Sequence, residues 1–342
     1  MPSPKSRKGS NTSRRLRLPR FLYALLICLL FPAPASAEWT TGLSSHTPEY
    51  FLAADKSRKL LFQVERRKAD PVVTRTFDCI HGRREGDKQK EGDLRTPEGV
   101  YFVTHKIEQK LDFMEYGPHA FNLNYPNPAD RLRGKTGGGI WLHSKGQPIE
   151  GLTTRGCMAI DMYEIEDLVP LLIPGTPVII AEHLQGAPFE TPPEGTAAQG
   201  LLPSLPGETT VFHSAESPAD VCPPPGKTSE QTVRCKTLLW MERRLGRTDD
   251  ILELYDRKKF PRGNREKISS LRKRLRSEFQ LQHDVFLDRE GIRILEGPGY
   301  WVSCFIKSYE RKGVLHHGLQ ALYWMPDDKG DCLIIGEVWI SN

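Results

Sequence analysis

The chain has 342 residues, with 48 lysines and arginines against 43 aspartates and glutamates, for a formal net charge of +5. Seven of the basic residues and none of the acidic ones lie in residues 1–37, so the rest of the chain has a net charge of −2. That balance excludes a general attraction to nucleic acid, and 38% hydrophobic with 9% aromatic residues exclude a disordered chain or a membrane bundle.

Residues 1–37 have the pattern of a secretory signal peptide. A basic run precedes the apolar stretch Phe21–Phe31, and the small residues Ala35-Ser36-Ala37 follow as a cleavage site. The apolar stretch is shorter than the roughly 20 residues that cross a bilayer. We therefore expect cleavage before Glu38, export to the periplasm or cell envelope, and no transmembrane span in the mature protein.

The cysteines beyond the leader suggest one disulfide. Cys222 and Cys235 flank a short polar segment and are the pair we expect to be bridged in an oxidising compartment. Cys304 and Cys332 lie in strand-like segments and either form a second bridge or are buried free thiols. No His/Cys spacing is typical of a zinc site, so we predict no metal and no cofactor.

Composition divides the mature chain into three parts: a domain over 38–182, a linker rich in Pro, Gly, Ser and Thr over 183–227, and a second domain over 228–342. In the first, one helix is expected at Asp161–Val169, with Glu164 three residues after a capping Asp161. Frequent turns between the strands favour a mostly-β sandwich or barrel. The predicted strands are Lys59–Glu65, Val72–Ile80, Val100–His105, Gly139–His143 and Pro177–Glu182.

The last part has helical patterns first and strand patterns afterwards, which predicts an α+β domain. Helices are expected at Ser229–Leu245, Ile251–Tyr255 and the strongly basic segment Glu266–Gln280. A long antiparallel sheet should follow, with strands at Asp284–Leu287, Gly291–Leu295, Tyr300–Glu310, Gly318–Met325 and Cys332–Ile340.

One stretch has the residues for nucleophilic catalysis. His143 closes an apolar strand, and Cys157 follows in the run Gly151–Ile160. A cysteine nucleophile needs a partner that takes its proton, because a free thiol titrates near ~8.5. Gly156 would let the backbone approach a substrate carbonyl, and the amides of Gly156 and Cys157 are candidates for an oxyanion hole. The alternative is a buried strand histidine and an unrelated buried cysteine.

This run resembles the signature of the YkuD-type L,D-transpeptidase family (ErfK/YbiS-like subgroup), in which a strand-end His precedes Ser/Thr-x-Gly-Cys. Other segments agree in the order in which the family has them, and the resemblance covers roughly Tyr50 to Glu182. These segments are Gly86-Asp87-Lys88, Gly92-Asp93, Thr96–Tyr101, Asn124–Asn127 with Asp130, Lys135–Ile140 and Pro174–Val178.

The resemblance implies acyl transfer on peptidoglycan stem peptides. Cys157 would attack the diaminopimelate carbonyl and release D-alanine, His143 would act as base and then acid, and the Ser144 carbonyl would orient the ring. The family often has His where Arg155 stands, and Arg or Asn where Ala159 stands. Arg155 either replaces a lost substrate contact or stabilises its loop.

Aromatic residues near this run are candidates for substrate binding. Tyr125, Trp141 and Tyr116 would line a groove for the sugar-peptide substrate, or belong to the core. Arg131, Arg133 and Lys135 would bind substrate carboxylates or form a solvated face.

The last domain is similar to NTF2-like cone folds, which follow the catalytic domain in some cell-shape L,D-carboxypeptidases. That similarity implies a filled pocket or one that binds a wall protein or peptide. An enzymatic use of the cone is the alternative, and Glu337, Tyr309, Tyr323 and His283 are the candidate polar groups for it. Three functions remain open. They are an L,D-transpeptidase, an L,D-carboxypeptidase that cuts the same bond to set cell shape, and a non-catalytic wall-binding protein.

Overall fold

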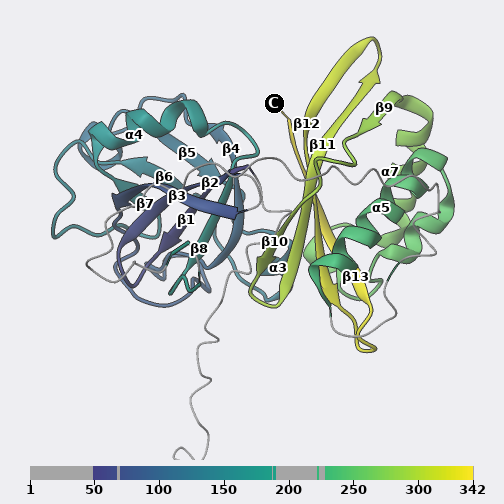
Figure 1. The fold of residues 1–342 in the computed structure, drawn as a ribbon, viewed down its shortest axis with the longest axis horizontal. Coiled ribbons are helices and arrows are strands. Elements are labelled where there is room, and N and C mark those ends of the chain that lie inside the picture. The colour runs from purple at the N-terminus through teal and green to yellow at the C-terminus, as the bar shows by residue number, and fades with distance from the viewer. Residues whose placement is uncertain (1–48, 68–69, 187, 190–221, 223–227, 342) are drawn as a thin grey trace, which may run out of the picture. The chain divides into compact units, whose positions relative to one another are not determined.

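The computed structural model describes residues 49–67, 70–186, 188–189, 222 and 228–341. The predicted leader over 1–37 and most of the predicted linker lie outside these residues. The described residues belong to one compact unit, which contains the two sheets seen in Figure 1.

The first sheet has eight strands in the order β3-β2-β1-β8-β4-β5-β6-β7 and mixes parallel with antiparallel pairs. An isolated bridge between Ile80, just beyond β3, and Ala159 in β7 joins the two ends of this order, so the sheet curls back on itself. This agrees with the predicted mostly-β domain of sandwich or barrel type. The strands are β1 (Tyr50–Asp55), β2 (Leu60–Arg67), β3 (Asp70–Asp78), β4 (Gly99–Lys106), β5 (Ala120–Leu123), β6 (Trp141–Ser144), β7 (Met158–Ile160) and β8 (Pro177–Ala181).

Short helices connect these strands. Asn127 and Asp130 form a capping box at the start of α3, and Asp161 caps α4 through the Tyr163 backbone N–H. The predicted helix at Asp161–Val169 is confirmed. The elements are α2 (Phe113–Tyr116), α3 (Pro128–Leu132), α4 (Met162–Leu168) and the 3-10 turn η1 (Val169–Leu171).

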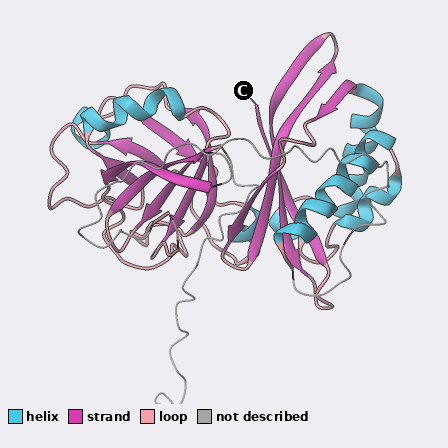
Figure 2. Ribbon diagram, viewed as in Figure 1, coloured by secondary structure: helices cyan, strands magenta, loops and turns pink. Residues whose placement is uncertain are grey.

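The second sheet is antiparallel, in the order β10-β11-β12-β13 with β9 paired to β11, and helices cover one of its faces (Figure 2). The predicted α+β order is confirmed, although the second predicted helix is a 3-10 helix. The elements are α5 (Glu230–Gly246), η3 (Asp249–Leu254), α6 (Phe260–Gly263), α7 (Ile268–Leu281), β9 (His283–Leu287), β10 (Arg293–Gly297), β11 (Tyr300–Arg311), β12 (Val314–Pro326) and β13 (Cys332–Ser341).

Alternation along β11 divides the side chains between two cores. Phe305 packs with α5 and α7, whereas Val302 and Cys304 pack with β1, β4 and β8 of the first sheet. Tyr300 lies between the sheets, and its hydroxyl accepts hydrogen bonds from the Val100 backbone N–H at 2.8 Å and from Asn127 Nδ2 at 3.1 Å. The two sheets therefore share one apolar core and a buried polar junction.

The predicted disulfide is confirmed, and the alternative left open for Cys304 and Cys332 is decided in favour of free thiols. Cys222 and Cys235 are bridged. Cys304 and Cys332 are buried free thiols, because Cys304 faces the core shared with the first sheet and Cys332 faces the helices.

Candidate active site

His143 lies in β6 with a side chain that is 1% exposed. Its Nδ1 is 2.5 Å from the Ser144 carbonyl oxygen. A carbonyl only accepts hydrogen bonds, so Nδ1 carries the proton and Nε2 keeps its lone pair. Burial lowers the pKa of His143 to about 4, and the ring is neutral at physiological pH. This is the protonation state of a general base.

Cys157 immediately precedes β7 and is a partly exposed free thiol. β6 and β7 are parallel, with Leu142 opposite Met158 and His143 opposite Ala159. Because side chains alternate along a strand, His143 and Cys157 project from the same face of neighbouring strands, one pleat apart.

The local environment keeps the thiol protonated. The Cys157 Sγ donates to the Gly139 carbonyl at 3.5 Å. Burial raises the pKa of Cys157, and a backbone hydrogen bond from Trp141 and the charges of Lys145 and Arg155 oppose that rise. With a neutral His143 beside it, the resting pair is thiol and imidazole.

Gly156 is required by the shape of the nucleophile loop. Its φ is +135°, and a Cβ there would lie 2.8 Å from the Arg95 carbonyl oxygen. The Gly156 N–H donates to Thr154 Oγ1 at 3.1 Å. That contact occupies one of the two amides predicted for an oxyanion hole, so the Cys157 N–H is the stronger candidate.

Two threonine side chains hydrogen-bond to the backbone of the loop that carries Cys157. Thr154 Oγ1 donates to the Cys157 carbonyl at 2.7 Å. Thr96, the first residue of the Thr-Pro-Glu-Gly turn, donates to the Gly156 carbonyl at 3.0 Å and accepts from the Gly82 N–H at 2.9 Å. The Thr96–Gly99 turn, one of the segments that resemble the family, is thus hydrogen-bonded to the loop that carries Cys157.

Helix α2 provides one wall of the site. The Tyr116 ring lies 5.2 Å from the His143 ring, edge-on, and 5.2 Å from the Trp141 ring. Lys145 Nζ pairs with Glu115 at 2.9 Å, and both charges act on His143 and Cys157. This pair could not be predicted from the sequence, because only the fold brings together residues that lie so far apart in the chain.

The predicted substrate-binding residues lie in different places. Arg155 is exposed beside the nucleophile, and Trp141 is half-buried against Tyr116. Tyr125 corrects the prediction. It is 6% exposed in the core of the first sheet, and its hydroxyl donates to the Thr136 carbonyl at 3.2 Å, so it does not line a groove.

The three cations considered for substrate carboxylates are held by the protein itself. Arg131 donates to the Gly263 carbonyl and Arg133 to the Pro298 carbonyl. Lys135 pairs with Asp130 at 2.9 Å and with Asp87 at 2.6 Å. They join the catalytic sheet to the C-terminal region and fix the loop after α3.

A polar cavity of about 250 Å³ lies between α7 and the second sheet. Lys307 has its Nζ 5.1 Å over the Tyr309 ring and 5.5 Å over the Trp339 ring, and burial lowers its pKa to about 8. Glu337 and Arg274, 3.5 Å apart, share this cavity. Glu337 and Tyr309, two of the four candidate polar groups, therefore line one cavity.

The other two candidate polar groups lie elsewhere. Tyr323 is fully buried, and its hydroxyl accepts from Asn124 Nδ2 at 3.2 Å. His283 is exposed in β9. The basic helix is also not a uniformly solvated face, because Arg274 pairs with Glu266, Glu278 and Glu337.

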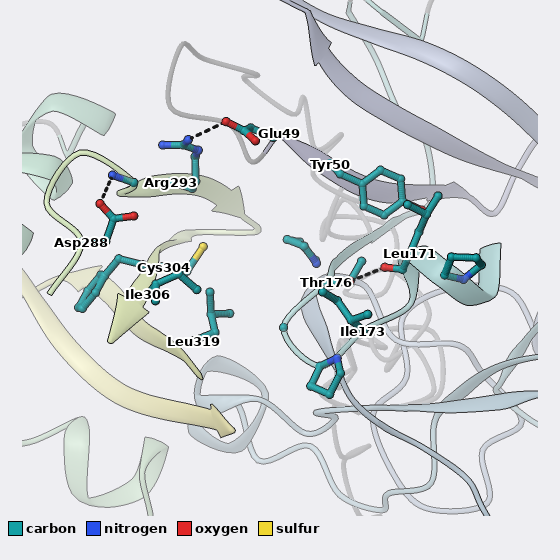
Figure 3. A pocket seen from close by; sticks show the side chains of 16 residues that line it. Glu49, Tyr50, Leu171, Ile173, Thr176, Asp288, Arg293, Cys304, Ile306 and Leu319 are labelled. Atoms are coloured by element: carbon teal, nitrogen blue, oxygen red, sulfur yellow. Dashed lines mark hydrogen bonds and ion pairs between the residues drawn. The ribbon is translucent and has the colours of Figure 1, made fainter. Parts of the chain in front are cut away.

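A larger cavity of about 560 Å³ separates the start of β8 from β10, β11 and β12 (Figure 3). Apolar side chains such as Ile173 and Leu319 line it, and Arg293 meets Glu49 at its edge, 3.5 Å away. It contains none of the predicted site residues. Within the described part of the chain, no cluster of three metal-ligating side chains occurs, and no helix has the length and apolarity to cross a membrane.

Comparison with known proteins concerns mainly the first part of the chain. Residues 49–180 match the model of the YkuD L,D-transpeptidase catalytic domain. This segment is a YkuD-type L,D-transpeptidase catalytic domain. The chain is 27% identical over 135 residues to YafK of Escherichia coli K12, which is described as an L,D-transpeptidase. The aligned part covers 40% of this chain and 51% of YafK. The chain thus spans about half the length of the curated relatives it matches.

Two solved structures share the fold over most of the chain. The helical cell shape determining protein Pgp2 of Campylobacter jejuni is 22% identical, with 87% of this chain and 96% of that chain covered and a TM-score of 0.55. Bd1075 of Bdellovibrio bacteriovorus is 21% identical, with 91% and 98% covered and a TM-score of 0.51. Because the coverage extends beyond the L,D-transpeptidase domain, the likeness includes the C-terminal region.

Proposed function

We propose that the protein is an L,D-transpeptidase that acts on the tetrapeptide stems of peptidoglycan through a thioester on Cys157. The observation that carries this proposal is the pairing of two neutral groups on one sheet face. The His143 Nδ1 proton is donated to the Ser144 carbonyl, and Cys157 is a free thiol immediately before the neighbouring strand β7. Such a pair transfers a proton as the nucleophile attacks.

In the acylation step, the thiol proton of Cys157 moves to His143 Nε2 while Sγ bonds to the diaminopimelate carbonyl carbon. The oxyanion would accept a hydrogen bond from the Cys157 N–H. The C–N bond then breaks, and His143 returns the proton to the departing D-alanine amine. Arg155, exposed beside the loop, would contact a substrate carboxylate in place of the family's residue at Ala159.

Deacylation decides between transfer and hydrolysis. An amine acceptor attacking the thioester gives a cross-link, and water gives a tripeptide. In both cases His143 takes a proton from the attacking amine or water. It then returns this proton to the departing Cys157 sulfur, which restores the thiol. The likeness of fold to a cell shape determining protein over 87% of this chain supports L,D-carboxypeptidase activity as the second candidate.

The remaining architecture supports work in the cell envelope. We infer a signal peptide over 1–37, a catalytic domain over 38–182, a linker over 183–227 and an NTF2-like domain over 228–342. A disulfide between Cys222 and Cys235 suits an oxidising compartment such as the periplasm. The cavity around Lys307 and Glu337 would bind a wall peptide or protein, because it offers both charges and aromatic faces.

The test is incubation of the purified protein with tetrapeptide muropeptides and identification of products by mass. Cross-linked dimers with free D-alanine support transfer, and tripeptides alone support hydrolysis. If no product forms and Cys157→Ala matches the wild type, only a non-catalytic wall-binding function remains.

A further inference from the structure

The loop that approaches the Cys157 thiol is a run of three glycines. Gly137 has a φ of +92° and Gly139 a φ of +63°, whereas the φ of Gly138 is not in this positive range. The Gly139 carbonyl faces the nucleophile and accepts its S–H at 3.5 Å. The conformation of one glycine therefore sets which backbone group the sulfur meets.

The residue pair before the glycines is anchored. Lys135 is 3% exposed and pairs with Asp130 and Asp87 at 2.9 and 2.6 Å. The next residue, Thr136, donates its N–H to the Gln89 carbonyl at 3.1 Å. Conformational freedom in this loop is thus limited to the glycines.

Beyond them the chain is held again. Ile140 is buried in the core of the first sheet, and its carbonyl accepts the Leu123 N–H at 2.9 Å. Glycine adopts positive φ without steric cost, and other L-residues do so reluctantly. The backbone conformation at Gly139 therefore determines where the Gly139 carbonyl points. A substitution there can change this direction with little effect on the rest of the structure.

Other groups facing Cys157 do not take over this contact. Glu115 and Lys145 both act on the thiol but are paired with each other at 2.9 Å. Arg155 favours the thiolate, and His143 is neutral. The Gly139 carbonyl, with its negative end toward the sulfur, stabilises S–H and repels S⁻.

We propose that the Gly139 carbonyl is a latch that holds the Cys157 thiol in its resting position, and that a backbone N–H of the bound stem peptide displaces it and releases the thiol to His143. Gly139 is then both a positioning residue and a substrate contact. An extended peptide offers backbone N–H groups, and an N–H is a stronger donor to a carbonyl than the weakly donating S–H that it would displace. The proposal rests on the proposed function for its substrate.

The test compares Gly139→Ala with Gly138→Ala. A Cβ at either position meets nothing within 4 Å, so the variants differ in backbone angle alone. The readouts are the pH profile of Cys157 alkylation by iodoacetamide and the KM and kcat for a tetrapeptide. Gly139→Asn is the rescue variant, because asparagine tolerates left-handed φ better than alanine does.

In Gly139→Ala we expect the alkylation profile to move to lower pH by about half a unit, with an alkylation rate at pH 7 raised about threefold. KM should rise several-fold with kcat little changed. Gly138→Ala should match the wild type, and Gly139→Asn should lie between the wild type and Gly139→Ala.

Identical alkylation profiles for Gly139→Ala and Gly138→Ala would overturn the latch. If Gly139→Ala does not fold, Gly139→Ser and Gly138→Ser replace the alanine pair, and identical alkylation profiles for these two would then refute the proposal. The alkylation readout needs no turnover. A failure of the latch is therefore distinct from a failure of the proposed function, which would show as a wild type without products.

Discussion

Tyr300→Phe should destabilise the whole protein although it removes a single oxygen far from the nucleophile. The Tyr300 side chain is 1% exposed at the start of β11, and its hydroxyl accepts from the Val100 N–H at 2.8 Å and from Asn127 Nδ2 at 3.1 Å. Phenylalanine keeps the ring that packs against Tyr323, with centroids 5.9 Å apart.

The magnitude follows from the two donors that lose their partner. A buried polar group left without a hydrogen bond costs about 1–3 kcal/mol, so two such groups would cost about 2–6 kcal/mol in the free energy of unfolding. We expect the lower part of that range, because Asn127 Nδ2 keeps a second hydrogen bond, to the Val100 carbonyl at 3.1 Å. Val100 and Asn127 are both fully buried, so water does not readily take the place of the lost hydroxyl.

The assay is urea unfolding of the purified protein followed by circular dichroism, with Tyr163→Phe as the matched control. Tyr163 lies in α4 and is 74% exposed, so its loss of a hydroxyl should change the free energy of unfolding by less than about 0.5 kcal/mol. A Tyr300→Phe result within that same range would refute the view that the second sheet completes the hydrogen bonding of the catalytic domain.

Three further predictions concern the site and the disulfide. Burial lowers the pKa of His143 from 6.5 to about 4. Between these two pH values the imidazole is protonated in the unfolded chain and neutral in the folded protein, so acidification favours unfolding. The wild type should therefore lose up to about 3 kcal/mol relative to His143→Asn as pH falls from 6.5 to 4, and parallel pH–stability curves would contradict this. Gly156→Ala, which places a Cβ 2.8 Å from a carbonyl oxygen at a φ of +135°, should reduce turnover of tetrapeptide at least about tenfold. Gly151→Ala, at a φ of +71° in open space, should keep most of it, and equal activities would refute the steric argument. Replacing Cys222 and Cys235 by serine should lower the free energy of unfolding by up to about 3 kcal/mol and abolish its sensitivity to reductant; an unchanged response to dithiothreitol would show that the bridge contributes nothing.

The strands β2, β3, β4 and β8 were expected close to their observed bounds. β8 is buried at all five residues and was recognised from its β-branched residues, not from alternation. β1 was missed because five of its six residues are buried, so alternation is absent, and because Ala53 and Ala54 have low strand propensity. β5 and β7, with four and three residues, are too short for a pattern to be recognised.

The candidate site was predictable where a local motif carries it. His143 and Cys157 were found from residue types within one short stretch, and the structure places His143 in β6 and Cys157 immediately before the parallel strand β7. The Glu115–Lys145 pair was not, because it depends on how α2 folds over β6. Tyr125 was misplaced because sequence does not distinguish a groove aromatic from a core aromatic.

The most direct test of the proposed chemistry is the intact mass of the protein after brief incubation with a tetrapeptide stem. The account predicts an adduct equal to the tetrapeptide minus D-alanine, located on the peptide that contains Cys157 and absent from Cys157→Ser. Release of D-alanine by Cys157→Ser at the wild-type rate, with no adduct on the wild type, would contradict it.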